Sequence, residues 1–111
     1  MSFRMDKVNK LIKNELSLVL GQIRDKYLGF ITITKVETAR DLSIANVYFS
    51  SFENRNEDEV KKVLTHYNRE IYNHMKARVT LKKMPHLNFK IDKAIIHANE
   101  LEKLFNSIKS E

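Results

Sequence analysis

The chain has 111 residues, two glycines, one proline and no cysteine, and its formal net charge at pH 7 is +6. Without cysteine, disulfides, thiolate catalysis and cysteine-ligated zinc are excluded. The length predicts a single domain, residues 1–111, with its own core and with disordered tails at 1–3 and 109–111. The polar N-terminus lacks the apolar segment of a secretory signal, and no apolar run reaches the ~18 residues of a membrane span. We therefore expect a soluble, cytoplasmic protein.

The first segment, residues 4–24, has the periodicity of an amphipathic helix. Apolar residues recur there at steps of three and four, at Val8, Leu11, Ile12, Leu16, Val19 and Ile23. This spacing places them on one face of a helix. Two runs rich in β-branched and aromatic residues follow, at 30–36 and 44–52, and their alternation predicts two strands. The polar stretch 37–43 between them predicts a hairpin connection longer than two residues.

A second helix is predicted after residue 55, with Asn56 or Asp58 as its N-cap. Its apolar stripe comprises Val60, Val63, Leu64, Tyr67, Ile71 and Met75. On the other side, cations recur every seven residues, at Lys62, Arg69, Lys76 and Lys83. Seven residues are nearly two helical turns, so an unbroken helix would align these cations over roughly 30 Å. The two β-branched residues in the stretch 78–81 favour a break before Lys83.

The single proline, Pro85, ends any helix, and the alternation that follows it predicts a third strand at 86–91. The last segment predicts a short closing helix, with Ala98, Leu101, Phe105 and Ile108 on one face. The resulting order is α–β–β–α–(α)–β–α. A three-stranded sheet with one face covered by helices satisfies it, so we expect an α+β fold.

Positive charge is concentrated in one third of the chain. Residues 61–93 contain nine Lys or Arg against two acids, Glu70 and Asp92, whereas the rest of the chain sums to −1. Such a concentration indicates a polyanionic partner, either nucleic acid or an acidic membrane surface; a solvated face with no partner is the alternative. We expect the nine cations to line up on one flank.

Three classes of function could explain this concentration of positive charge. An enzyme has little support, because the chain lacks a phosphate-binding loop and a nucleophile elbow. His66, Glu70 and His74 share one side of the second helix, which would suit a metal-dependent ribonuclease, but the two histidines are about 12 Å apart along the helix. We therefore interpret them as exposed surface residues, and predict no metal, no cofactor and no catalytic site.

A membrane-surface helix would need an apolar face left free beside its cations, and here that face is needed to cover the sheet. Nucleic-acid binding fits better, because lysine and arginine on one face neutralise phosphates irrespective of sequence. Base reading would need aromatic platforms, and only Tyr72 and Tyr27 look free for that role. We expect recognition of backbone and shape.

The residues also carry a family resemblance. The run "LGFITITKVETARDLSIANVYFS", residues 28–50, is similar to the signature hairpin of the ribosome-binding factor A family. The matching positions there are Leu28, Gly29, Val36, Glu37, Asp41, Leu42, Val47, Tyr48 and Ser50. Farther on, "MPHLNFKIDKAI" resembles the family's third strand, through Pro85, Leu87, Phe89, Asp92 and Ile95. The resemblance spans nearly all of residues 5–105.

The resemblance implies a type II KH-like fold and a monomeric, non-enzymatic factor. It implies binding to the small (30S) ribosomal subunit and its 16S rRNA, and help in late maturation, including processing of the 5′ end of the rRNA precursor. A generic KH-like binder of single-stranded RNA, away from the ribosome, is the alternative. From the charge pattern the candidate RNA-binding residues are Lys62, Arg69, Lys76, Arg78, Lys82 and Lys83, with Arg40 added from the exposed hairpin loop.

The family usually has Ala-x-Gly at a kink within its long helical segment, where this chain has Tyr67, Asn68 and Arg69. We therefore expect either a straighter helix or a kink displaced toward residues 77–80.

Overall fold

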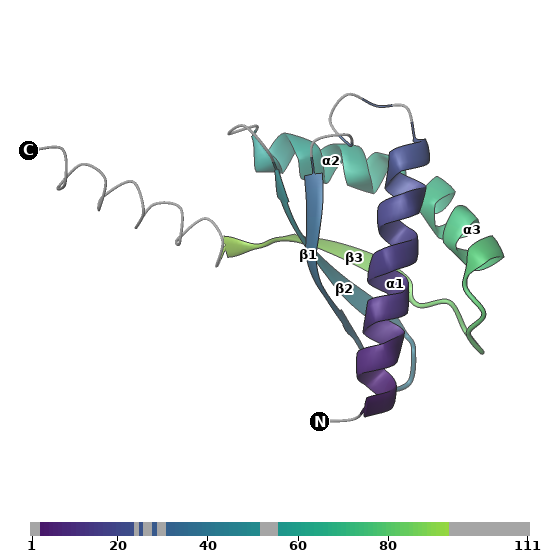
Figure 1. The fold of residues 1–111 in the computed structure, drawn as a ribbon. Helices are drawn as coiled ribbons and strands as arrows, with labels where there is room; N and C mark the ends of the chain where they lie inside the picture. Colours follow the sequence, from purple (N-terminus) through teal and green to yellow (C-terminus); the bar gives the residue numbers. More distant parts are fainter. Residues whose placement is uncertain (1–2, 24, 26–27, 29–30, 52–55, 94–111) are drawn as a thin grey trace, which may run out of the picture.

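A computed structural model describes residues 3–23, 25, 28, 31–51 and 56–93. The element order is α1 (Phe3–Gln22), β1 (Ile31–Thr38), β2 (Ile44–Ser51), α2 (Glu57–His66), α3 (Asn68–Arg78) and β3 (His86–Ile91) (Figure 1). This is the α+β, type II KH-like arrangement that the sequence predicts. The predicted closing helix lies outside the described residues. Among those that are described, no helix combines the length and apolar character that a bilayer span requires.

The sheet has the strand order β1-β2-β3, with β2 in the centre. β1 pairs antiparallel with β2, from Ile31 opposite Ser51 to Thr38 opposite Ala45, and the register shifts at a bulge between Ile33 and Lys35. β3 runs parallel to β2. A parallel pair needs a long crossover, and α2 and α3 supply it.

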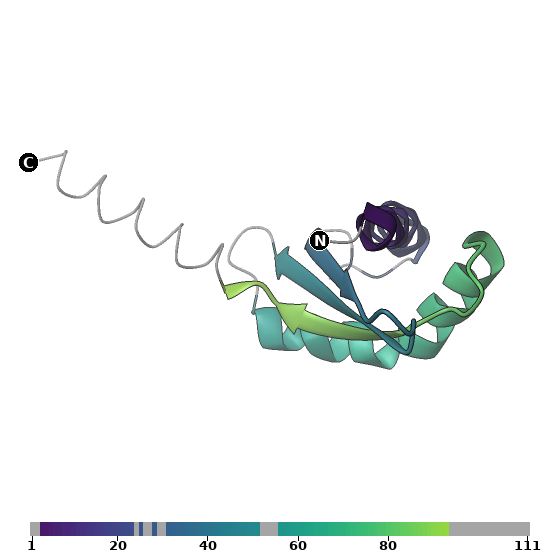
Figure 2. The same ribbon diagram turned by 90° about the horizontal axis from the view of Figure 1, so that it is seen from below.

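The three helices cover one face of the sheet, and Figure 2 views α1 nearly end-on beside the strands. Along β2, Ala45, Val47 and Phe49 are fully buried, while the residues between them are more accessible. The helices contribute Ile12, Leu16, Val19, Leu20, Val60, Leu64, Ile71 and Met75 to the same core. Alternation in the strands and three- to four-residue spacing in the helices therefore build one apolar layer, and the opposite sheet face stays accessible.

The long helical segment breaks at Tyr67. This residue ends α2 and precedes α3, with φ −90° and ψ 5°. Its ring contacts the His66 ring edge-on, with centroids 5.0 Å apart, and burial followed by nearby Asp25 raises its pKa. The next side chain, Asn68, donates from Nδ2 to the carbonyl of Leu87 at 3.3 Å, which ties the start of α3 to the outer edge of β3.

The expectation of a straighter helix, or of a kink displaced to 77–80, is therefore wrong. A glycine is not needed at this break, because Tyr67 and Arg69, the position of the family's glycine, both lie outside the positive-φ region. At the break the half-buried ring of Tyr67 packs against the core, and the hydrogen bond from Asn68 joins the start of α3 to the sheet. α3 then ends at Arg78, so the predicted break before Lys83 is confirmed.

The other local predictions also hold. Asn56 is the N-cap of α2, and its Oδ1 accepts from the amides of Asp58 and Glu59 at 3.0 and 3.3 Å. Three acids follow in the first turn, where the helix dipole favours negative charge. In the β1–β2 turn, Leu42 has φ 60°, a left-handed conformation that costs a non-glycine residue about 1–2 kcal/mol.

Candidate nucleic-acid interface

All nine cations between residues 61 and 93 are exposed, but they do not share one flank. Lys90 lies on β3 between the inward-facing Phe89 and Ile91, so it projects from the open face of the sheet. Arg78 projects toward α1, where its Nε donates to Oε2 of Glu15 at 2.7 Å. The expectation of one continuous flank is wrong, because the break at Tyr67 and the end of α3 at Arg78 redirect the chain.

The outer face of the α2–α3 pair carries mixed charge. Lys62 lies 3.8 Å from the carboxylate of Glu59. Arg69 is on the exposed side of α3 and borders a shallow hollow that also contains Glu70 and His74. Lys76, seven residues after Arg69, is exposed on the same side of that helix. Cations on this face are thus interspersed with acids.

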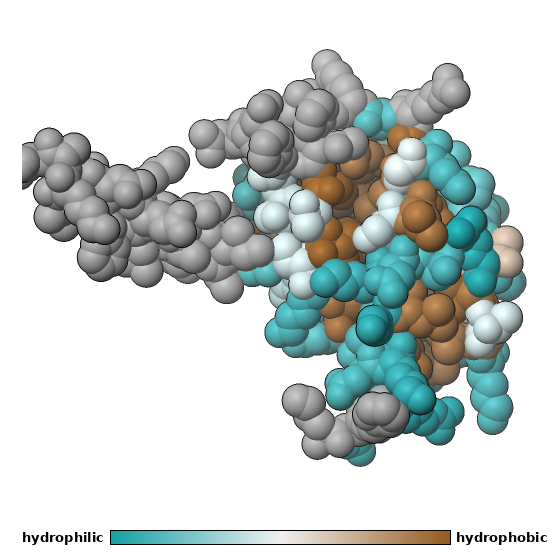
Figure 3. Space-filling view, in the orientation of Figure 1, coloured by the Kyte–Doolittle hydropathy of each residue, from teal (hydrophilic) through white to brown (hydrophobic). Residues whose placement is uncertain are grey.

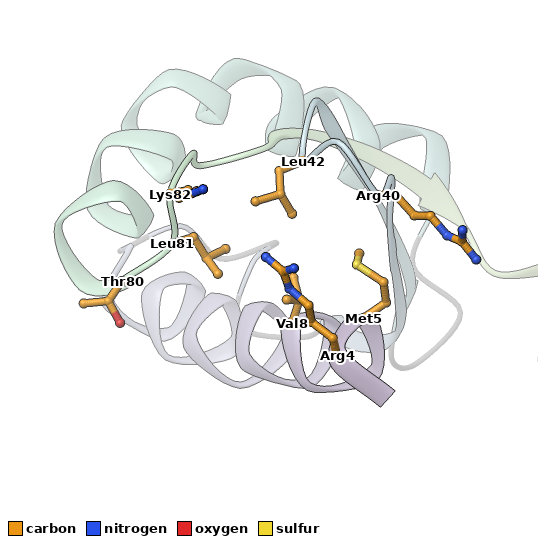
Figure 4. Close-up of a pocket in the computed structure, with 8 residues that line it drawn as sticks. All are labelled: Arg4, Met5, Val8, Arg40, Leu42, Thr80, Leu81 and Lys82. Carbon is orange, nitrogen blue, oxygen red and sulfur yellow. The ribbon is translucent and has the colours of Figure 1, made fainter. Parts of the chain in front are cut away.

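A second group of cations lines a groove formed by three segments of the chain. These segments are the start of α1, the β1–β2 turn and the stretch between α3 and β3, and the groove has a volume of about 450 Å³. Its eight lining residues are Arg4, Met5, Val8, Arg40, Leu42, Thr80, Leu81 and Lys82 (Figure 4). Three of them are cations from three separate elements, and none of the eight is acidic. We call this feature the loop-end groove.

Lys82 and Arg40 were both predicted from the sequence as RNA contacts, and the structure places them around the same groove. Arg4 was missed, because it lies outside the basic third of the chain and only the fold brings it close. In Figure 4 the Arg4 guanidinium lies in the middle of the groove, whereas Arg40 extends away from it. Lys83 is adjacent in the chain and exposed.

An acid beside the groove is held by its own turn. Oδ1 of Asp41 accepts from the amide of Ser43 at 3.0 Å and from its hydroxyl at 2.6 Å. These hydrogen bonds hold the pKa of the Asp41 carboxyl below its ordinary value, and nearby Lys83 lowers it further. Lys83 is therefore partly compensated by Asp41, while Arg4, Arg40 and Lys82 line a groove without a carboxylate.

The aromatic platform expected at Tyr72 is not free. Its ring stacks on His86, with centroids 5.6 Å apart and planes at 16°, and its hydroxyl donates to the carbonyl of Met84 at 3.2 Å. Tyr27, the other expected platform, lies outside the described residues. On the open sheet face, Lys35 lies over Tyr48 with Nζ 5.4 Å from the ring centroid. Lys35 also pairs with Glu37, which raises the pKa of the lysine.

The opposite end of the sheet is acidic. Asp92, directly after β3, accepts a hydrogen bond from the hydroxyl of Thr34 at 2.5 Å. Glu57, at the start of α2, is half-buried, and burial, then Asp58 and Asp92, raise the pKa of its carboxyl.

Charged and polar side chains cover much of the α1 side, with apolar ones between them (Figure 3).

The described residues contain no group of three side chains placed to hold a metal ion. His74 lies 3.9 Å from Glu70, while His66 packs against Tyr67. The spacing that suggested a metal-dependent ribonuclease produces a surface pair in this structure.

Comparison with known proteins gives a consistent answer. The family model of ribosome-binding factor A matches residues 4–105. A ribosome-binding factor A from Staphylococcus carnosus is 33% identical over 107 residues, covering 95% of this chain and 93% of the relative. Another, from Brevibacillus brevis, is 34% identical over 110 residues, covering 97% of this chain and 91% of the relative.

Solved structures agree with the fold. The crystal structure of ribosome-binding factor A from Thermus thermophilus has a TM-score of 0.73 at 23% identity, covering 78% of this chain and 93% of that one. A homology model of the Thermus thermophilus factor, fitted into the cryo-EM map of its complex with the 30S subunit, has a TM-score of 0.65 at 25% identity, covering 77% of this chain and 91% of that one.

Proposed function

Because the chain belongs to the ribosome-binding factor A family, we propose that it binds the small ribosomal subunit and assists its late maturation. The partner is the 16S rRNA within that subunit, and the processing that it promotes includes the 5′ end of the rRNA precursor. It acts as a monomeric binding factor in the cytoplasm, without catalysis and without a cofactor. The observation that carries this proposal is the likeness to a factor fitted into the map of a 30S complex.

The charge distribution supports an RNA partner. Every cation of the basic third is exposed, and exposed lysines and arginines bind phosphates with release of counterions. The contact residues that we propose are Arg40, Lys62, Arg69, Lys76, Arg78, Lys82 and Lys83. Arg78 is the weakest member, because Glu15 already neutralises it. Lys82 and Arg40 are the strongest members, because no acid lines the groove that they share.

Deletion of the protein tests the biological role. Cells without it should accumulate unprocessed small-subunit RNA and free subunits, most strongly in the cold. Unchanged rRNA processing and ribosome profiles in the deletion strain would contradict the proposal.

A charge-reversal variant tests the contacts. Replacing Lys76, Lys82 and Lys83 with Glu removes three proposed phosphate contacts and should flatten the salt dependence of subunit binding by about two to three, at ~0.7–0.9 per phosphate. Co-sedimentation with small subunits across a salt series measures this slope. The matched control reverses Lys10, Lys61 and Lys93, which are equally exposed, and should bind almost as the parent does. Equal losses in both variants would remove the three residues from the site.

The same assay separates the alternative function. Binding to short single-stranded RNA without binding to small subunits would favour a generic KH-like RNA binder over a ribosome factor.

A further inference from the structure

Four of the eight residues that line the loop-end groove are apolar, which contacts to phosphates alone do not require. Leu42 and Leu81 come from two different connections, and Met5 and Val8 come from α1 (Figure 4). We propose that this groove holds one unpaired nucleotide of the bound RNA, with its base against these apolar residues and the neighbouring phosphates on the cations. This inference rests on the proposed function and adds to it a site for a base.

The size and charge of the groove suit such an occupant. Its volume of about 450 Å³ lies within the roughly 300–1,000 Å³ range of small-ligand pockets. Arg4 comes from α1 and Lys82 from the segment between α3 and β3, so the two cations approach an occupant from different segments of the chain, while Arg40 of the β1–β2 turn extends away from the groove. The other described hollows differ in charge: the one beside Arg69 includes Glu70, the one beside Lys61 includes Asp58, and the one beside Lys13 has no acid but only that single cation.

The backbone of Leu42 provides a second, independent observation. Its φ of 60° is the conformation in which glycine or asparagine is common and leucine is rare. A strained backbone that carries a half-buried apolar side chain to the wall of a groove is a reason to infer a role for that side chain. Because Asn adopts this conformation more easily, Leu42→Asn removes the apolar wall and relieves the strain together.

A base fits this lining better than an acidic peptide does. In Figure 4 the guanidinium of Arg4 lies in the open middle of the groove, with Leu42 above it and Leu81 to its left. Guanidinium planes stack on unpaired bases, and single-stranded RNA is recognised by such splayed-out bases. A phosphate beside the base would then reach Lys82, and Arg40, which extends away from the groove, would reach a phosphate farther along the strand. A peptide would need several carboxylates to match the same cations.

The test is a cycle of two changes, one in the RNA and one in the protein. The probes are a fluorescein-labelled oligouridylate of eight nucleotides and a ribose-phosphate oligomer of the same length without bases. The parent protein should bind the oligouridylate roughly tenfold more tightly, because one stacked base contributes about 1–3 kcal/mol. Leu42→Asn should bind both oligomers equally within about twofold, as expected when base and wall act as one unit.

Controls separate the groove from general effects. Leu18→Asn makes the same change at an apolar residue of α1 that is 54% exposed and does not line the groove, and it should keep the preference for bases. Thermal unfolding of Leu42→Asn should occur at or above the parental temperature, and Leu42→Gly provides a second variant without the side chain. Lys82→Glu should lower the salt slope by about 0.7, the value per phosphate of a single strand, whereas Lys10→Glu should not. Arg4→Glu removes the guanidinium that would stack on the base and should therefore reduce the preference for bases.

The outcomes are distinct. An equal preference for bases in the parent and in Leu42→Asn, or no binding of the oligouridylate by the parent, overturns the nucleotide site. A parent dimer that Leu42→Asn converts to a monomer also overturns it, in favour of a second copy of the chain. Failure of the proposed function looks different, because the parent protein itself would then not co-sediment with small subunits.

Discussion

The two ends of the sheet differ in how their charges are arranged. At the end where β1 turns into β2, the loop-end groove is lined by Arg4, Arg40 and Lys82. At the other end, about 20 Å away along β3 at 3.3 Å per residue, Asp92 and Glu57 lie close together, and burial with neighbouring acids raises the pKa of Glu57. A chain with a net charge of +6 thus has a groove without a carboxylate at one end of the sheet and acids mixed with Lys61, Lys62 and Lys93 at the other.

The difference arises from topology and not from the order of charges in the sequence. Lys61 and Lys62 belong to the basic third of the chain, yet they share a surface hollow with Asp58 at the acidic end. Arg4 and Arg40 lie outside that third and join Lys82. Counting charged residues along the sequence therefore indicates the sign of the partner's charge, while the fold determines where that partner can dock.

The largest expected effect comes from reversing the charge of the three cations that line the loop-end groove. Reversing Arg4, Arg40 and Lys82 to Glu should weaken small-subunit binding on the order of a hundredfold at moderate salt, because three cations that line the groove become repulsive carboxylates. Reversing Lys61, Lys90 and Lys93, which are exposed and outside the proposed contact set, changes the net charge equally and should cost less than about threefold by the same electrostatic argument. Quantitative co-sedimentation measures both. Similar losses would mean that net charge and not the loop-end groove controls binding.

Much of the fold follows from the sequence alone. The alternation in 86–91 and the stripe of α1 specify which side chains are buried, because burial and periodicity are local properties. The break at Tyr67 lies where the family has its kink, but the residues there do not indicate it, since the hydrogen bond that accompanies it joins Asn68 to Leu87 of β3, nineteen residues later. The groove was missed for the same reason, because its cations come from three distant segments. One local signal of the groove existed in the β1–β2 turn, where an apolar residue, Leu42, follows the charged residues Arg40 and Asp41.

The next effect tests whether the start of α3 is tied to the sheet. Asn68→Ala removes the hydrogen bond to the carbonyl of Leu87 and should lower the free energy of unfolding by about 1 kcal/mol. Urea unfolding measures this loss. Asn73→Ala removes an exposed amide from the same helix and should be neutral or slightly stabilising, because Ala has the higher helix propensity. Subunit binding through the loop-end groove should persist in both, and its loss in Asn68→Ala would couple α3 to the groove.

A smaller effect, a gain in RNA binding, is expected when Arg78 is released from its ion pair. Arg78 is bound to Glu15 at 2.7 Å, and both side chains are partly exposed, at 36% and 25%. Such a pair contributes about 0–1 kcal/mol to stability, so Glu15→Gln should unfold only slightly more easily. Because this change frees Arg78 and removes a negative charge, RNA binding should strengthen by roughly two- to threefold. The salt slope should rise by less than about one. Weaker binding in this variant would place Glu15 itself in the interface.

The smallest effect concerns the acidic end and its dependence on pH. Burial raises the pKa of Glu57 in the folded state above the ordinary value of 4.5. The folded protein therefore binds the proton more tightly than the unfolded chain does, and stability falls as pH rises through the ordinary and then the raised pKa. Glu57→Gln should match the parent at pH 3 and exceed it at pH 7, by a few tenths of a kcal/mol because solvent screens this half-buried group. Thermal unfolding from pH 3 to pH 7 measures the difference.

Glu59→Gln, in the same turn but exposed, should instead lose stability at pH 7, because the dipole of α2 favours its charge. A gain in both variants would mean that simple relief of acidic repulsion, and not the burial of Glu57, distinguishes this end of the molecule.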